Sequence, residues 1–428
     1  MDLLTYLEKS PCSFWAVENL RALLLEQEYE PLAESAHWHL RVGGKYVVTR
    51  NDSSLLAFRV PSKDFSGFML GAAHDESPSY KVKREAELWG KEYVQVAVEP
   101  YGSMIPESWL DTPLSVAGRL LVREENGLAA RLVNVDKDLL LIPRVAIHLQ
   151  NKTKESKPLN PAVDMQPLYR TAAYGVDFLA EVADAAGVGK QEILSFDLFL
   201  YNRAAGVLWG QEGCFLSAPR VDDLVGVYAA FTGFCRAREN LASVPVLAVF
   251  DNEEVGSGTK QGACSTFLAD TLRRISAAFG GEGETHLRRL ANSFLLSVDN
   301  GHALHPNHPE LADKNHAPVL NGGVIIKQNA AQHYCTDGVS DAVVRLLCQE
   351  GDIPYQYYYN RADLRGGQTL GNLSNTQVSV NGADVGLAQL AMHSAFETVG
   401  ARDVERLCKL LTIFYGKAFR EENGSFIL

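Results

Sequence analysis

The stretch VPVLAVFDNEEVGS, residues 244–257, joins a run of apolar residues directly to a cluster of carboxylates. The run VPVLAVF lacks the polar–apolar alternation of a half-exposed strand, so it predicts a strand buried on both faces, as in parallel sheets. Helix-like segments at 222–238 and 263–279 lie on either side of it in the chain. This alternation of helix and strand predicts an α/β fold, with an α/β/α layered domain around a mostly parallel sheet.

Three other apolar runs also end in acids or histidine. They are GFMLGAAHDES (67–77), LSAPRVDDL (216–224) and SFLLSVDNGHALH (293–305). Because sites in open α/β sheets form at the carboxyl ends of the strands, these ends are expected to lie close together. The four runs supply His74, Asp222, Glu253, Glu254 and Asp299, and a helix predicted at 384–400 adds His393.

Two histidines with several carboxylates are typical of a metal site, and there are enough of them for two metals. Histidine nitrogen and carboxylate oxygen suit Zn²⁺, with Co²⁺ or Mn²⁺ as substitutes. Neighbouring side chains point to opposite sides of extended chain, so one of Glu253 and Glu254 can bind metal while the other faces water as a base. Each residue alone also has an ordinary explanation: an exposed acidic loop, helix capping by Asp222 and Asp223, or a core histidine at His393.

The length and charge of the chain limit the number of domains and the kinds of partner that we expect. With 428 residues, two or three domains are expected. Residues 84–215 change to short β-type segments without a metal-type cluster, which predicts an inserted β-rich domain within a catalytic domain formed by 1–83 and 216–428. The net charge of −12, without a Lys/Arg run, argues against nucleic acid and anionic membranes as partners.

The N-terminus and the cysteines predict a cytoplasmic protein. Residues 1–30 read as amphipathic helix and lack the pattern of a signal peptide, and no apolar run reaches the ~18 residues of a membrane span. The 7 cysteines are scattered and never form a CxxC, which is typical of reduced core residues.

Taken together, the motifs resemble the aspartyl aminopeptidase family, cytosolic exopeptidases with two zinc ions. The likeness covers nearly the whole chain, in the same order, and includes SAPRVDDL (217–224), DNEEVGS (251–257), DNGHALHPN (299–307), VIIKQN (324–329) and AMHSAFET (391–398). It implies that His74 and Asp299 bind one zinc, and that Glu254 and His393 bind the other. It further implies that Asp222 bridges the two ions and that Glu253 is the general base that activates the bridging water.

Two stretches depart from the family pattern. The family has His-x-Asp-Ser-Pro, whereas this chain has Glu76 in place of the acid that orients the first histidine. The longer carboxylate of Glu76 can still reach His74, and Asp75 is an alternative. In LRGGQTLGNLSN (364–375), Gln368 replaces a serine, and this stretch, with Gly367, is expected to line the pocket for the substrate's amino end.

The resemblance also implies a substrate and an assembly. An N-terminal Asp or Glu side chain needs a cation or several donors; Lys327 is the first candidate and His302 the second. Family members form dimers that build a tetrahedral dodecamer through the inserted domain, which sends a histidine into a neighbouring active site, and His148 matches that position. The predicted function is therefore removal of N-terminal Asp or Glu from peptides. The alternatives are a neutral aminopeptidase or related dinuclear amidohydrolase, and a catalytically weak scaffold protein, which the Glu76 departure motivates.

Overall fold

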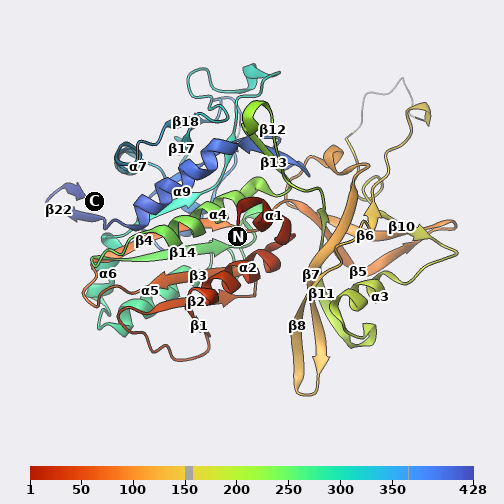
Figure 1. Ribbon diagram of the computed structural model, residues 1–428, viewed down its shortest axis with the longest axis horizontal. Helices are drawn as coiled ribbons and strands as arrows, with labels where there is room; N and C mark the ends of the chain where they lie inside the picture. The colour runs from red at the N-terminus through yellow and green to blue at the C-terminus, as the bar shows by residue number, and fades with distance from the viewer. Residues whose placement is uncertain (150–157, 365) are drawn as a thin grey trace.

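The computed structural model describes residues 1–149, 158–364 and 366–428. Its largest sheet has nine strands (Figure 1). Their spatial order is β1 (Glu30–Leu32), β2 (Lys45–Arg50), β3 (Ser54–Arg59), β14 (Ser243–Phe250), β4 (Gly67–His74), β15 (Phe294–Val298), β19 (Asn381–Gly386), β17 (Val324–Gln328) and β18 (Tyr355–Tyr359). The central strands β14, β4, β15 and β19 are all parallel, whereas β3 is antiparallel to both of its neighbours. The predicted α/β class with a mostly parallel sheet is confirmed.

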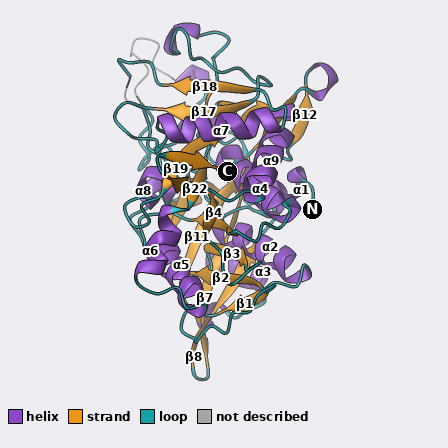
Figure 2. Cartoon of the chain, turned by 90° about the vertical axis from the view of Figure 1, so that its left-hand side faces the viewer, coloured by secondary structure: helices purple, strands orange, loops and turns teal. Residues whose placement is uncertain are grey.

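Helices cover both faces of this sheet and complete the three-layer arrangement (Figure 2). One face packs against α1 (Leu3–Lys9), α2 (Ser13–Glu26), α4 (Val221–Arg236), α7 (Gly338–Glu350) and α9 (Ala401–Tyr415). The other face packs against α5 (Phe267–Ala278), α6 (Glu284–Ala291) and α8 (Leu370–Ser374). The helices predicted at 222–238 and 263–279 are confirmed as α4 and α5.

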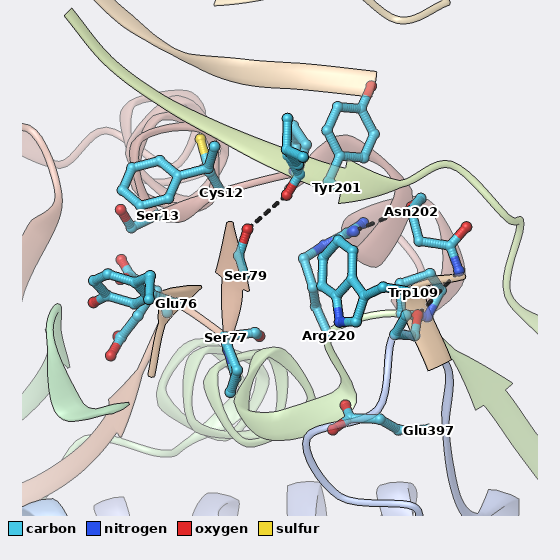
Figure 3. A pocket seen from close by; sticks show the side chains of 18 of the residues that line it. Cys12, Ser13, Glu76, Ser77, Ser79, Trp109, Tyr201, Asn202, Arg220 and Glu397 are labelled. Carbon is cyan, nitrogen blue, oxygen red and sulfur yellow. Dashed lines mark hydrogen bonds between the residues drawn. The ribbon is translucent and has the colours of Figure 1, made fainter. Parts of the chain in front are cut away.

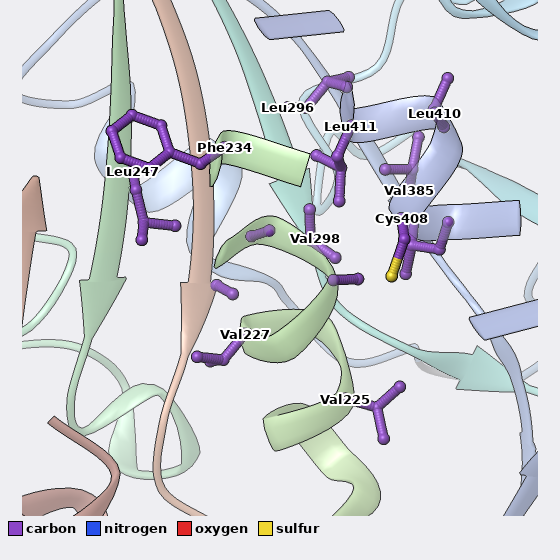
Figure 4. Close-up of a cluster of buried hydrophobic side chains, with 14 of the residues drawn as sticks. Val225, Val227, Phe234, Leu247, Leu296, Val298, Val385, Cys408, Leu410 and Leu411 are labelled. Carbon is purple, nitrogen blue, oxygen red and sulfur yellow. The ribbon is translucent and has the colours of Figure 1, made fainter. Parts of the chain in front are cut away.

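The central strand β14 is buried on both sides, and this explains its apolar sequence. Leu247 belongs to the apolar cluster beneath α4 and α9, whereas its neighbour Val246 belongs to the cluster beneath α5. Figure 4 shows part of the first cluster, to which α4 contributes Phe234 and α9 contributes Leu411. Burying one such side chain is worth roughly 1.5–3 kcal/mol, so these contacts fix the strand between its two helical layers.

A second sheet, of seven strands, lies beside the first (Figure 1). Its order is β11 (Ile193–Asn202), β5 (Ser79–Trp89), β6 (Tyr93–Tyr101), β10 (Leu168–Thr171), β9 (Leu140–Leu141), β7 (Pro113–Glu124) and β8 (Gly127–Asn134), with β11 also paired to β7. Its strand pairs are antiparallel, and α3 (Phe178–Ala186) packs on it. The sheet has an apolar cluster of its own, as expected of a β-rich insert. Residues 150–157 of the predicted insert lie outside the described residues, and the division at 84 and 215 stays a prediction.

A third sheet connects the start of α4 with the segment that carries His393. It consists of β12 (Val207–Trp209), β13 (Phe215–Ala218), β21 (Glu397–Gly400), β20 (Ala388–Leu390) and β16 (Gly301–His302). The chain closes with a two-stranded hairpin, β22 (Arg420–Glu422) and β23 (Ser425–Ile427). Within the described parts of the chain, every helix is too short or too polar to cross a membrane.

Arg119 on β7 joins the two large sheets. Its Nε donates a hydrogen bond to Asp197 Oδ2 at 3.1 Å, and its Nη1 donates to the backbone oxygen of Asn51, between β2 and β3, at 2.7 Å. Asp197 also accepts from Lys81 Nζ at 2.9 Å. Burial raises the pKa of Asp197, but the hydrogen bonds and charges of Lys81 and Arg119 outweigh it, so the pKa lies below its ordinary value of 3.8.

We expect Asp197→Asn to lower the melting temperature by about 1–2 °C at pH 7, because the variant loses the charge that holds Arg119 in place. Since the folded pKa lies below the unfolded value, this stabilisation is present in full above the unfolded pKa and is lost as the pH falls through the folded pKa. Thermal unfolding between pH 7 and pH 3.5 should therefore show the difference narrowing in acid. Glu124→Gln, which removes an exposed ion pair with Arg131, is the control and should change the melting temperature little. A difference in melting temperature that does not change with pH would contradict an ionic origin of the stabilisation.

Candidate metal centre

The predicted site residues gather at the carboxyl ends of neighbouring parallel strands. His74 is the last residue of β4, and Asp299 directly follows β15. Glu253 comes three positions after the end of β14. β4 lies between the other two strands and pairs with both in parallel, so the three ends share one edge of the sheet.

Asp222 reaches the same edge from the start of α4. Its backbone has φ −87° and ψ 110°, which is extended geometry inside the first helical turn. Neither carboxylate oxygen of Asp223 has a hydrogen-bond partner, nor does Asp222 Oδ1. The helix-capping explanation for Asp222 and Asp223 is therefore wrong, and the Asp222 carboxylate instead faces the two histidines.

Glu253 and Glu254 lie in a short 3₁₀ helix, Glu253–Val255, and the expectation of extended chain is corrected. Asn252, with φ 64°, starts this turn in the left-handed region, and its side chain donates to the Tyr101 hydroxyl at 2.8 Å. The tight turn directs both carboxylates into one cavity, where extended chain would separate them.

The predicted helix at 384–400 is wrong. Residues in this range form β19, β20 and β21, and His393 lies in the turn before β21 with φ 65°. Of the apolar residues around His393 that suggested a helix face, Leu390 ends β20, whereas Ala391, Met392, Ala395 and Phe396 lie in the turn between β20 and β21. The turn brings the His393 imidazole to Asp222 and Glu254, so the residue reaches the predicted place by a different route.

Among the described residues, four groups of three have the geometry to hold a metal ion. Two of them share Asp222: His74, Asp222 and Asp299 form one, and Asp222, Glu254 and His393 form the other. In the first, His74 Nε2 lies 3.6 Å from Asp222 Oδ1 and 4.0 Å from Asp299 Oδ1. In the second, His393 Nε2 lies 3.6 Å from Asp222 Oδ2 and 3.3 Å from Glu254 Oε1. Two ligand atoms about 2.0–2.1 Å from a tetrahedral zinc lie about 3.4 Å apart, so these spacings fit zinc.

The electrostatics of the site also fit cations. Asp222 is buried, and its Oδ1 has no hydrogen-bond partner. Burial raises the pKa of Glu253 well above its ordinary value, and the charges of Asp299 and Glu254 raise it further, while His74 opposes them. Burial likewise raises the pKa of Glu254 to about 7, against the opposing hydrogen bond and charge of His393. A group of buried acids that repel one another is stabilised when divalent cations bind between them.

Glu76 lies behind His74, on the side away from the cavity. His74 Nδ1 is 3.0 Å from the backbone oxygen of Glu76 and 3.6 Å from its carboxylate Oε2. The other carboxylate oxygen, Oε1, accepts the backbone N–H of Glu254 at 2.9 Å. The glutamate that departs from the family pattern thus contacts two candidate ligands, and it presents Nδ1 with an acceptor that leaves Nε2 free for a metal.

The candidate ligands open into a cavity of about 300 Å³. It is lined by His74, Asp222, Glu253, Glu254, Asp299, His302, Lys327, Gly367, Gln368 and His393, among others. The Lys327 ammonium is buried there and donates to Asp299 Oδ2 at 3.2 Å and to the backbone oxygen of Asn300 at 2.8 Å. Of the stretch 364–375, Arg365 lies outside the described residues.

His148, another predicted site residue, does not line this cavity in the described single chain. It lies in a short 3₁₀ helix, Ile147–Leu149, and is exposed. This position is compatible with a contact to another subunit, and its role stays a prediction.

Several residues of the site were not predicted from the sequence. Tyr334, Tyr358 and Met392 line the cavity, and Tyr334 places its ring 4.9 Å from Lys327 Nζ. Glu397 lies behind Asp222 and His393 and hydrogen-bonds to the backbone of both. Glu397 belongs to the AMHSAFET motif, and this was the one indication of its place near His393.

Comparison with known proteins agrees with this geometry. The family described as aminopeptidase I zinc metalloprotease (M18) matches residues 6–415. A probable M18 family aminopeptidase 2 of Clostridium novyi is 38% identical over 423 residues, which cover 97% of this chain and 98% of the relative.

Solved structures are similar as well. A chain in the cryo-EM structure of the Ape4 and Nbr1 complex has a TM-score of 0.92 at 31% identity, covering 97% of this chain and 85% of that one. A structure described as the S. cerevisiae mApe1 dodecamer has a TM-score of 0.84 at 28% identity, covering 96% and 95%. The chain therefore belongs to the M18 family of zinc metalloproteases, the aminopeptidase I family.

Proposed function

We propose that this aminopeptidase works with two zinc ions per subunit. His74 and Asp299 would hold one ion, Glu254 and His393 the other, and Asp222 both. The observation that carries the proposal is the pair of ligand groups that share the Asp222 carboxylate, one on each of its oxygens. Sharing of this kind is the arrangement of co-catalytic metal sites, and Co²⁺ or Mn²⁺ are candidate substitutes because the donors are nitrogen and oxygen.

The reaction is hydrolysis of the first peptide bond. Bound zinc supplies Lewis acidity, which polarises the scissile carbonyl and makes an attacking water more acidic. Glu253 takes the proton of that water on its carboxylate and passes it to the leaving amine. Support for this role comes from its position: Glu253 lies in the cavity, and its carboxylate lies within 4.8 Å of the ligand atoms of His74 and Glu254.

For the substrate, we propose an N-terminal Asp or Glu. His302 and Lys327 both line the cavity and carry nitrogen donors, and Gly367 would leave room for the substrate's amino end. A buried carboxylate needs such donors because an unpaired buried charge is costly.

One observation favours a neutral residue as the second candidate. The Lys327 ammonium is already bound to Asp299 and to two backbone oxygens, and burial and Lys327 lower the pKa of His302, which keeps that imidazole neutral. If neither side chain offers a free positive charge to the substrate, an uncharged N-terminal residue is the better fit.

We further propose that the chain assembles, from dimers up to a dodecamer, as the structural relative described as a dodecamer does. Exposed apolar side chains on the second sheet and its loops support this, among them Ile147, Leu149, Val163 and Tyr174. A surface rich in such residues is typical of a protein interface. In that assembly His148 would reach a neighbouring active site, and the protein would act in the cytoplasm on peptides.

Glu253→Gln should lower kcat by about 10²–10⁴-fold, because the amide cannot take the proton, while the zinc content stays at the wild-type value. The measurement is peptide hydrolysis together with metal analysis of the same sample. Glu284→Gln, an exposed residue on α6, is the matched control and should keep full activity. Wild-type rates in Glu253→Gln would remove Glu253 from its role, and joint loss of zinc and activity would make it a ligand.

Peptides with N-terminal Asp or Glu should be cleaved with kcat/KM at least about tenfold above the same peptides with Asn, Gln, Leu or Lys. The Asp/Asn and Glu/Gln pairs are matched in shape, so their ratio measures recognition of charge alone. Rates are measured on zinc-loaded protein at fixed pH. Equal rates within both pairs, with Leu preferred, would reject the acidic preference in favour of the neutral alternative.

A further inference from the structure

Glu397, the first residue of β21, is a buried carboxylate with both oxygens engaged. It is 2% exposed. Oε2 accepts the backbone N–H of Asp222 at 3.0 Å, and Oε1 accepts the backbone N–H of His393 at 2.7 Å. One side chain therefore ties together the backbones of two candidate ligands that come from distant parts of the sequence.

The turn that carries His393 needs support from outside. Ala391 and His393 have φ values of 55° and 65°, in the left-handed region that non-glycine residues occupy at a cost of roughly 1 kcal/mol each. The hydrogen bond from His393 N to Glu397 fixes the peptide group at one of these two residues. Without this hydrogen bond, the turn would relax toward ordinary backbone geometry, and the His393 imidazole would move.

Further hydrogen bonds hold the other side of the turn. The backbone N–H of Ile105 donates to His393 O at 3.0 Å, and the Ala395 N–H donates to Ser108 Oγ at 2.9 Å. Asn202 Nδ2 donates to Ala395 O at 3.0 Å. These contacts anchor the turn to segments next to the second sheet, whereas Glu397 sets its position relative to Asp222.

Burial and then the charge of Asp222 raise the pKa of Glu397 to about 8, against the N–H groups of Asp222 and His393 and the charge of His393, which lower it. Arg220, which is half-buried, lines the same small cavity of about 40 Å³ as Glu397 (Figure 3). Its guanidinium donates to the backbone oxygens of Leu7, Ser10 and Asn202. Its positive charge is therefore paired with neutral groups, and it acts on Glu397 at longer range.

We propose that Glu397 is a positioning residue that holds Asp222 and His393 in register for metal binding. It acts mainly on the ion at Glu254 and His393, because it contacts His393 directly and Asp222 is shared. This inference rests on the proposed two-zinc function. Glu397 would thus position Asp222 and His393, whereas Glu76 contacts the other pair of candidate ligands, His74 and Glu254.

The test is zinc titration of metal-free full-length protein, wild type against E397Q. In the variant one oxygen remains, and the amide NH₂ meets a backbone N–H, so one of the two hydrogen bonds is lost. We expect the affinity for the ion held by Glu254 and His393 to fall about 10–100-fold, the usual effect of removing a group that orients a ligand, with the other affinity changed less than about threefold. H393A, which removes a ligand of that ion, gives the reference titration, and E405Q on α9 is the control.

Three outcomes separate the possibilities. Two unchanged affinities in E397Q overturn the inference, and so does an equal loss at both sites with a lower melting temperature of the metal-free protein. Failure of the wild type to bind two zinc ions contradicts the proposed function instead. If E397Q does not fold, E397D replaces it, since it keeps a carboxyl group at this position but is one methylene too short to reach both N–H groups.

Discussion

Repulsion between buried carboxylates is the constraint on which the rest of this structure depends. Asp222, Glu253, Glu254 and Asp299 converge on one edge of the sheet, where two unit charges 4 Å apart repel by roughly 4 kcal/mol at an effective dielectric of 20. A flexible framework would let these acids move apart. Parallel strands with apolar layers on both faces hold them in place, and this is why long apolar runs end so abruptly in acids.

The second requirement is control of the backbone behind the ligands. Glu397 accepts the N–H groups of Asp222 and His393 with its two carboxylate oxygens. Glu76 accepts the N–H of Glu254 with Oε1 and contacts His74 Nδ1 with its backbone oxygen. Four of the five proposed ligands are held by these two glutamates, and Lys327 holds the fifth, Asp299. The positions of the candidate ligands are therefore fixed by contacts within the protein as well as by their own strands and turns.

Much of the fold was predictable from the sequence because short apolar runs are enough to identify the central strands. The runs ending at His74, Phe250 and Asp299 are buried on both faces, and such runs have few alternatives to parallel strands. The turns were not predictable. Asn252 sits in a left-handed conformation because Tyr101, from the second sheet, holds its side chain, and the apolar spacing around His393 imitates a helix although Glu397 and the second sheet impose a turn. Contacts between distant segments decide both cases.

The hydrogen bonds between the second sheet and the His393 turn make the two large sheets depend on each other. The two large sheets have separate apolar clusters, so the chain looks divisible. However, Ile105, Ser108 and Asn202 bind the very turn that presents an imidazole to the metal centre. Without the second sheet, the first sheet would keep its carboxylates but would lose the hydrogen bonds that hold the His393 turn. The second sheet and the candidate metal centre are thus linked mechanically, so a change in the second sheet can alter the position of His393.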